Sequence, residues 1–200
     1  MQTIETDRLL LRPFTWEDLG FLNTLHGDPE VALYIGYGKP RTEAENRSLL
    51  ENIFNAYSVE GFGHLGVLSK GSGEMIGRCG LSLLEVAVSP ADGSAPKWFW
   101  NRGSAPADLQ IVHRIEIGYT FARAHWGHGY ATESAAAVRD FAFRSLQEDQ
   151  LVAAISPENA ASINVANKLG FSFRGPIIAF GKPAEHHQID RVEWESITHR

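Results

Sequence analysis

The sequence predicts an α/β fold in which one mixed, mostly antiparallel sheet is flanked by helices. Two strand-like runs joined by a glycine-containing turn, within residues 62–84, indicate an antiparallel hairpin. Between residues 113 and 170, strand-like and helical patterns alternate, which is typical of βαβ units with parallel pairing. The chain has 200 residues, of which 44% are hydrophobic. We therefore expect a single domain over residues 1–200.

Composition and charge exclude several classes of protein. Lys and Arg number 18 against 24 Asp and Glu, giving a net charge of −6 without a basic run, which argues against nucleic-acid binding. The single cysteine, Cys79, cannot form an internal disulfide and fits a reducing compartment. The first residues do not resemble a secretory signal, and no apolar stretch reaches the roughly 20 residues of a membrane span. We expect a cytoplasmic protein with neither a membrane nor a nucleic-acid partner.

The first elements are a strand and two helices. Leucines at Leu9–Leu11 predict the strand. Thr15 is a suitable N-cap for the first helix, which Gly27-Asp28-Pro29 ends. Thr42 begins the second helix, with a capping box completed by Glu45 three residues later.

The middle of the chain predicts three strands and a long helix. Two strands, residues 62–68 and 75–84, flank a turn at Lys70-Gly71-Ser72-Gly73. A third covers residues 113–121, and apolar residues at helical spacing predict a helix over residues 130–146.

The last third predicts a strand, a helix and two extended segments. The strand is expected at residues 151–156, and the helix over 159–169 ends at Gly170, which suits a C′ position. Residues 171–174 and 188–197 are predicted to be extended.

Residues 85–111 form an insertion between the third and fourth predicted strands. The segment is rich in Ala, Pro, Ser and Gly but contains Trp98-Phe99-Trp100. One interpretation is a flap that packs on another surface, and the other is an added hairpin that covers its own hydrophobic patch. Burial of these rings between two subunits would make a homodimer, because aromatic residues are enriched at interfaces.

The segment from Tyr119 to Thr132 predicts an anion site. A strand ends there, a turn with Gly127 and Gly129 follows, and a long helix begins. The first backbone N–H groups of a helix have no intrahelical acceptor, and glycines let an anion approach them closely. The P-loop lysine is absent, and Thr132 stands where a dinucleotide fingerprint has its last glycine. Alternatively, the glycines are only caps.

Three segments together resemble the GCN5-related N-acetyltransferases (GNAT), and within them the ribosomal-protein and amino-acid N-acetyltransferase branch. Trp126-Gly-His-Gly129-Tyr-Ala131 is similar to the family's cofactor motif, Gln/Arg-x-x-Gly-x-Gly/Ala. The second motif, Asn-x-x-Ser…Lys-Leu-Gly-Phe, is matched by Asn159, Ser162 and Lys168 to Phe171. The opening Thr6–Phe14 also resembles that branch. The resemblance extends from about Thr6 to Ile197, apart from the insertion.

The resemblance implies acetyl-coenzyme A as co-substrate. The pyrophosphate would lie on the amides of residues 126–131, the strand end at 119–121 would bond the pantetheine arm, and the helix after the next strand would face the thioester. Asn159 and Ser162 are also good N-cap residues. The implied cofactor contacts are Tyr119, Thr120, Phe121, Trp126, Gly127, His128, Gly129, Tyr130, Ala131, Thr132, Asn159 and Ser162.

The sequence departs from the family pattern at two positions. Trp126 occupies the Gln/Arg position, so a side-chain contact to phosphate is lost there. Ala166 stands where many relatives have a tyrosine that protonates the leaving thiolate, and Ser162 is the nearest polar candidate for that role. The resemblance makes Glu116 the candidate general base, where burial would make the carboxylate more basic. Alternatively, Glu116 pairs with Arg114 or Arg123.

The predicted function is acetyl transfer from acetyl-coenzyme A to a primary amine, by direct attack in a ternary complex. The acceptor would be a peptide or small molecule: a protein N-terminus, an amino acid, a polyamine or an amino-sugar antibiotic. No metal is expected, because His125 and His128 lack a zinc spacing and thiolate support. Cys79 has no adjacent histidine and reads as a small core residue. The alternative, motivated by Ala166, is a non-catalytic acyl-coenzyme A-binding or interaction module.

Overall fold

The computed structural model describes residues 2–87, 95–100 and 103–198. The chain forms two compact units. The N-terminal unit comprises residues 1–81 and 118–138, and the C-terminal unit comprises residues 82–117 and 139–200. The chain passes from one unit to the other within β4 (Met75–Ala87), β6 (Ile111–Phe121) and α4 (Tyr130–Arg144).

Antiparallel strands form the sheet of the N-terminal unit. β1 (Ile4–Glu5) pairs with β2 (Leu9–Pro13), β2 with β3 (His64–Ser69), and β3 with the first part of β4. The Ser69 amide donates to the Glu74 carbonyl at 2.9 Å, and Gly73 in the turn has a φ of +74°. The predicted hairpin around residues 70–73 is therefore confirmed.

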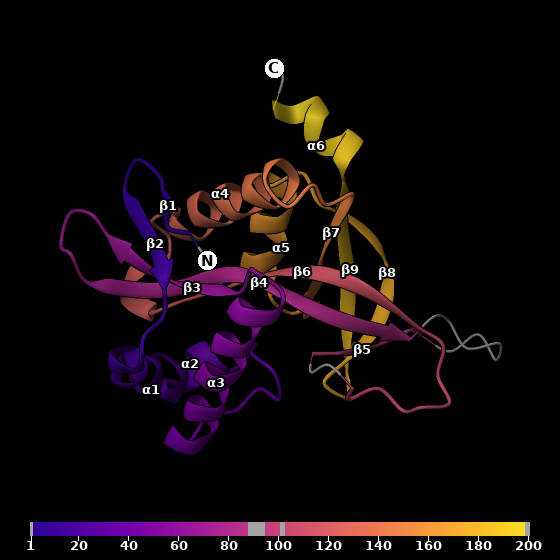
Figure 1. The fold of residues 1–200 in the computed structure, drawn as a ribbon, viewed down its shortest axis with the longest axis horizontal. Coiled ribbons are helices and arrows are strands. Elements are labelled where there is room, and N and C mark those ends of the chain that lie inside the picture. The colour runs from indigo at the N-terminus through magenta and orange to yellow at the C-terminus, as the bar shows by residue number, and fades with distance from the viewer. Residues whose placement is uncertain (1, 88–94, 101–102, 199–200) are drawn as a thin grey trace. The chain divides into compact units, whose positions relative to one another are not determined.

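Helices α1 (Leu19–Gly27), α2 (Pro29–Ala32) and α3 (Glu43–Val59) lie together in this unit, in indigo and purple in Figure 1. A short 3₁₀ helix, η1 (Trp16–Asp18), precedes α1. The Thr42 hydroxyl accepts from the Glu45 amide at 3.3 Å, and the Thr42 amide donates to Glu45 Oε2 at 2.7 Å, which confirms the predicted capping box. The apolar faces meet in a core of Phe14, Leu22, Leu25, Val31, Leu50 and Ile53.

A polar cluster is buried in the N-terminal unit. Arg78 Nε donates to His26 Nε2 at 3.2 Å, and Arg78 Nη1 lies 3.2 Å from His64 Nδ1. His26 Nδ1 lies 2.7 Å from Asn46 Oδ1. Burial, reinforced by the Arg78 charge, lowers the pKa of His26 to about 3 and that of His64 well below its usual value. Both imidazoles are therefore neutral acceptors for one guanidinium.

Gly77 permits a close approach of β4 to the end of β6. A Cβ atom at this position would lie 2.6 Å from the Thr120 carbonyl oxygen and 2.5 Å from Phe121 Cδ1. The Ala122 amide donates to the Ile76 carbonyl at 3.0 Å just beyond this contact. The absence of a side chain at Gly77 therefore allows β4 to lie against the last residues of β6.

The sheet of the C-terminal unit is mixed. From the second part of β4, the strand order is β4, β5 (Lys97–Phe99), β8 (Ser172–Ala179), β9 (Lys182–Asp190), β7 (Gln150–Ile155) and β6. β5 pairs with β8 and β6 with β7 in parallel, while the β4–β5, β8–β9 and β7–β9 pairs are antiparallel. The predicted mixed sheet is confirmed, and α5 (Ala160–Lys168) follows β7 as expected.

The prediction of an extended segment at residues 188–197 is wrong beyond Asp190. Residues Arg191–Thr198 form helix α6. The Asp190 amide donates to Glu193 Oε2 at 2.8 Å, which is one half of a capping box. Trp194 is buried and stacks on Phe143 with ring centroids 5.0 Å apart. The Asp-x-x-Glu spacing was the available sequence signal for this helix.

The prediction of a short extended segment at residues 171–174 underestimates β8. The strand continues to Ala179 through Gly175-Pro176 and pairs with β9 across a register shift between Phe173 and Gly175. The irregularity accommodates residues that normally indicate a break in a strand.

The described part of the insertion packs on the core of its own unit. Val86 lies opposite Trp98 in the pairing of β4 with β5, and Trp98 is 4% exposed in a cluster with Leu84, Val152 and Ile177. This favours the added hairpin over a flap that packs elsewhere. Residues 88–94 and 101–102 of the insertion lie outside the described residues.

Glu85 connects β4 to the later part of the insertion. Its carboxylate accepts from the amides of Gly103 and Ala105 at 2.6 and 3.1 Å. The hydrogen bond from the Gly103 amide lowers the pKa of Glu85, and burial raises it by a smaller amount. The pKa therefore lies below its usual value.

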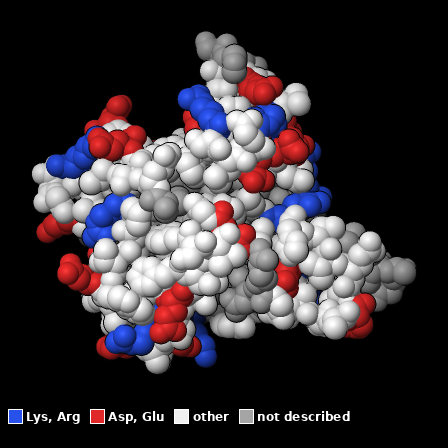
Figure 2. Space-filling model, in the orientation of Figure 1, with Lys and Arg blue, Asp and Glu red and all other residues white. Residues whose placement is uncertain are grey.

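Charges of both signs are interspersed on the face drawn in Figure 2. Among the described residues, several charges form ion pairs, such as Arg12 with Asp18 at 2.8 Å and Arg174 with Glu193 at 2.9 Å. Among the described residues, no helix combines the length and apolar character needed to cross a bilayer.

Candidate active site

The predicted phosphate loop lies between β6 and α4 in the N-terminal unit. After β6 ends at Phe121, a 3₁₀ turn covers Arg123–His125, and α4 begins at Tyr130. Gly127 and Gly129 have φ values of +78° and +80°, in the left-handed region that favours glycine. These two conformations turn the chain from the strand into the helix.

A row of backbone N–H groups is left for a ligand at this turn. Within the part of the chain that the structure describes, the amides of residues 127–132 donate to no protein acceptor. The first helical bond runs from the Glu133 amide to the Gly129 carbonyl at 3.0 Å. Free amides at the positive end of a 15-residue helix make a site for phosphate or pyrophosphate.

Side chains of the loop stabilise its conformation. Trp126 Nε1 donates to the Phe121 carbonyl at 2.8 Å, so the indole points back to the strand end. His128 Nδ1 lies 2.8 Å from the Trp126 carbonyl oxygen. The His128 ring stacks on Tyr130 with centroids 5.7 Å apart. The loop histidine therefore supports the loop from within.

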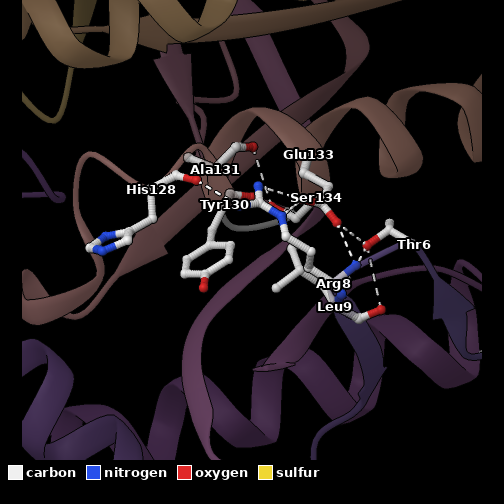
Figure 3. Close-up of polar contacts among 8 residues, drawn as sticks. All are labelled: Thr6, Arg8, Leu9, His128, Tyr130, Ala131, Glu133 and Ser134. Carbon is white, nitrogen blue, oxygen red and sulfur yellow. Dashed lines mark hydrogen bonds and ion pairs between the residues drawn. The ribbon is translucent and has the colours of Figure 1, made fainter. Parts of the chain in front are cut away.

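The segment before β2 is bound to the first turn of α4 (Figure 3). Arg8 Nε donates to Glu133 Oε2 at 2.6 Å, and Arg8 Nη1 donates to the His128 carbonyl at 3.0 Å. Thr6 Oγ1 and the Arg8 amide donate to Glu133 Oε1 at 2.6 and 2.9 Å. Burial opposes ionisation of Glu133, but the hydrogen bonds from Thr6 and Arg8 outweigh it and lower the pKa. Neither Arg8 nor Glu133 was predicted as a site residue from the sequence.

Glu116 lies in the C-terminal unit, on β6 opposite Val152 of β7. Its side chain is buried, Oε2 accepts from the indole nitrogen of Trp100, and Oε1 accepts from the Ala154 amide at 3.3 Å. Both donors favour the ionised carboxylate. Trp100 was not predicted as a partner of Glu116, because the contact depends on how the insertion folds.

The two arginines considered as alternatives for Glu116 have other partners. Arg114 Nη1 donates to the carbonyl of its neighbour His113 at 2.9 Å. Arg123 lies in the N-terminal unit, where it forms ion pairs with Asp28 and Glu30.

Asn159 and Ser162 lie at the start of α5 in the C-terminal unit. Asn159 Oδ1 accepts from the Ser162 amide at 3.1 Å, so Asn159 is the N-cap of the helix. Ser162 is half-buried, whereas Ala166, one turn later, is 2% exposed. Gly170 has a φ of +88°, and the Phe171 amide donates to the Ala166 carbonyl at 3.0 Å, closing the helix as predicted.

Cys79 is a core residue, as predicted. The side chain is fully buried in β4, and burial raises the pKa of its thiol to about 12. Over the residues that the structure describes, no three His, Cys, Asp or Glu side chains gather as ligands for a metal ion.

Comparison with known proteins identifies the family. Residues 8–172 match the model of the acetyltransferase (GNAT) domain. The chain is 31% identical over 176 residues to the uncharacterized N-acetyltransferase p20 of Bacillus licheniformis, covering 88% of this chain and 85% of that protein. It is 30% identical over 201 residues to the FsC-acetyl coenzyme A-N(2)-transacetylase of Aspergillus fumigatus. This match covers 96% of this chain and 77% of that protein.

The fold also matches solved acetyltransferase structures. One is RimL, the ribosomal L7/L12 alpha-N-protein acetyltransferase in complex with coenzyme A, with a TM-score of 0.69 and 16% identity over 94% of this chain and 98% of that one. The expected fold, enzyme class and co-substrate are confirmed. The chain belongs to the GNAT acetyltransferase family, whose members transfer the acetyl group of acetyl-coenzyme A to an amine.

Proposed function

We propose that the chain acetylates a primary amine in a ternary complex, with the pyrophosphate of acetyl-coenzyme A on the loop at residues 126–131. The observation that supports this placement is the row of free amides at residues 127–132. The strand end at Tyr119–Phe121 offers its backbone to the pantetheine arm. Bound acetyl-coenzyme A supplies the thioester, and side chains of the protein accept and donate the protons that the transfer requires.

Glu116 is the proposed proton acceptor. An ammonium group has no lone pair, so the acceptor must lose a proton before its nitrogen can attack the thioester carbon. The Trp100 indole and the Ala154 amide hold the Glu116 carboxylate in place and favour its charged form. Glu116 accepts the proton directly or through one water molecule.

Ser162 is the proposed proton donor to the leaving sulfur. The C–N bond forms as the C–S bond breaks, and the Ser162 hydroxyl gives its proton to the leaving thiolate while it takes up the second proton of the amine nitrogen. Ala166 has no polar atom in its side chain and is buried, which leaves Ser162 as the hydroxyl at the start of α5. Because Cys79 is buried with a raised pKa, an acetyl-cysteine intermediate at the chain's one cysteine is disfavoured.

The proposed acceptor is a cationic primary amine on a peptide or small molecule. An alpha-amino group is the acceptor named for RimL, and N(2) is the position named for the Aspergillus relative. The net charge of −6 is compatible with a cationic acceptor. A homodimer and a cytoplasmic location stay predictions from sequence.

The test is thiol release from acetyl-coenzyme A across a panel of peptide N-termini, amino acids, polyamines and aminoglycosides. With at least one amine, thiol should be released, and each molecule of thiol should be matched by one molecule of acetylated amine. Glu116→Gln should lower kcat while leaving the Kd for coenzyme A unchanged, and Ser162→Ala should lower kcat. Cofactor binding without turnover of any amine would instead favour a binding module.

A further inference from the structure

We propose that Arg8 is the cationic side chain of the phosphate site, where it both positions the loop and binds the cofactor pyrophosphate. This inference rests on the proposed placement of the pyrophosphate at residues 126–131. Arg8 precedes β2 and lies more than a hundred residues from the loop in sequence. The sequence of the loop alone therefore does not reveal this arginine.

The guanidinium lies directly against the loop (Figure 3). A Cβ atom on Gly129 would be 3.4 Å from Arg8 Nη2, and Arg8 Cζ lies 4.7 Å from the centroid of the Tyr130 ring. The Arg8 side chain is 49% exposed. It is therefore held beside the free amides and remains accessible to a ligand.

Arg8 has donors to spare for an anion. A guanidinium carries five N–H groups. Nε and Nη2 each lie 2.6 Å from Glu133 Oε2, and Nη1 donates to the His128 carbonyl. These contacts use three N–H groups at most, so at least two remain. A planar fork of this kind suits phosphate oxygens.

The contact with His128 has an electrostatic consequence for the loop. A carbonyl oxygen near an anion site repels the anion, because it bears a partial negative charge. Arg8 Nη1 donates to this oxygen and neutralises it, while Glu133 fixes the guanidinium from the other side. Arg8 thereby orients the peptide groups of the loop so that their amides face the ligand.

Arg8 also accounts for the departure at Trp126. The cofactor motif of the GNAT family has Gln or Arg at this position. Here the Trp126 indole instead donates to the Phe121 carbonyl. The polar side chain missing from the loop is thus supplied by the segment that precedes β2.

The test measures coenzyme A binding by titration calorimetry and the kinetics with two acetyl donors. Arg8→Gln should weaken coenzyme A binding by about 10- to 100-fold, the range expected for lost charge-assisted hydrogen bonds. It should raise KM for acetyl-coenzyme A similarly, leave kcat nearly unchanged, and reduce the salt dependence of binding. With acetyl-pantetheine, which has no pyrophosphate, KM should not change. Arg8→Lys should recover part of the affinity.

Lys70→Gln is the matched control. Lys70 Nζ donates to Glu5 and to the Thr6 carbonyl, so it also docks the segment before β2, but among the described residues its side chain has no hydrogen bond or ion pair with the loop. This variant should bind coenzyme A normally. Equal losses in Arg8→Gln and Lys70→Gln, or an equal KM increase with acetyl-pantetheine, would overturn the proposal in favour of a structural role.

Gly129→Val separates this inference from the proposed function. If Gly129→Val weakens coenzyme A binding and Arg8→Gln does not, the role of Arg8 is wrong and the loop placement stands. If neither variant alters binding although both are folded, the pyrophosphate does not bind at this loop, and both proposals fail.

Discussion

The indole nitrogen of Trp100 donates a hydrogen bond to the carboxylate of Glu116, so an inserted segment supports the proposed proton acceptor. The same indole stacks on Phe180 with ring centroids 4.2 Å apart. Phe180 has a φ of +52°, a conformation that non-glycine residues rarely adopt. The stack therefore helps to hold the Trp100 indole in place.

Trp100→Phe keeps an aromatic ring for the stack but removes the N–H donor. A carboxylate that loses a donor holds its proton more tightly. The acidic limb of the pH–rate profile should therefore move to higher pH, with KM for acetyl-coenzyme A unchanged. Trp126→Phe, which removes an indole bonded to the Phe121 carbonyl, is the control and should leave that limb in place. If the pH–rate profile of Trp100→Phe is not shifted, Glu116 is not the group that accepts the proton.

Gly77→Ala should destabilise the protein and disturb the strand end that precedes the loop. The new methyl group would overlap the Thr120 carbonyl and the Phe121 ring. Overpacking of this kind costs about 1–3 kcal/mol in the free energy of unfolding, measurable by urea denaturation. Gly71→Ala is the control, because its nearest neighbour would be Ser69 Oγ at an ordinary 3.7 Å. Equal stability of the two variants would contradict the close approach.

Stability should fall as the pH drops below about 6.5, where an unfolded histidine titrates. Because the pKa of His26 in the folded protein is about 3, only the unfolded chain takes up that proton between the two values. The unfolded state is then favoured by about 2 kcal/mol between pH 7 and pH 5 from His26 alone. Urea unfolding at both pH values measures this loss.

His26→Gln should be less stable at pH 7, because buried contacts are lost, yet its stability should depend less on pH. His113 is exposed on β6, so His113→Gln should keep the wild-type dependence. A pH dependence that is the same in His26→Gln and in the wild type would assign the acid sensitivity to other groups.

Cys79 should react with iodoacetamide far more slowly in the folded enzyme than after unfolding. With a thiol pKa of about 12, the thiolate fraction is about 10³-fold below that of a free cysteine, and burial blocks access as well. Mass spectrometry of native and urea-treated protein measures both rates. Fast labelling of the native enzyme with loss of activity would instead support an acetyl-cysteine intermediate at Cys79.

Local patterns were sufficient to predict the elements whose ends are determined by nearby residues. The Thr42–Glu45 capping box, the hairpin at residues 70–73 and the helix end at Gly170 all depend on contacts within a few residues. For the same reason, the row of amides at the start of α4 followed from Gly127 and Gly129. Helix α6 was missed, because residues 188–197 were predicted as one extended segment although Asp190 and Glu193 stand at capping-box spacing.

Partnerships between distant residues could not be read from the sequence. Arg8 meets Glu133 across 125 residues, and the indole of Trp100 reaches Glu116 only because β5 pairs with β4 and β8. Such contacts depend on sheet order and register, which single-sequence periodicity does not specify. The phosphate loop was therefore predicted without its arginine, and the proposed base without its indole donor.

Trp126 gives the enzyme an intrinsic optical reporter for its own ligand. The ring is 46% exposed within the loop, and its nitrogen is tied to the strand end, so an occupied loop changes the polarity around the chromophore. Among the other tryptophans, Trp98 is buried in the C-terminal unit and contributes a steady background. In the variants that keep Trp126, cofactor affinity can accordingly be followed by emission without an added dye, and Trp126→Phe gives the emission of the remaining tryptophans.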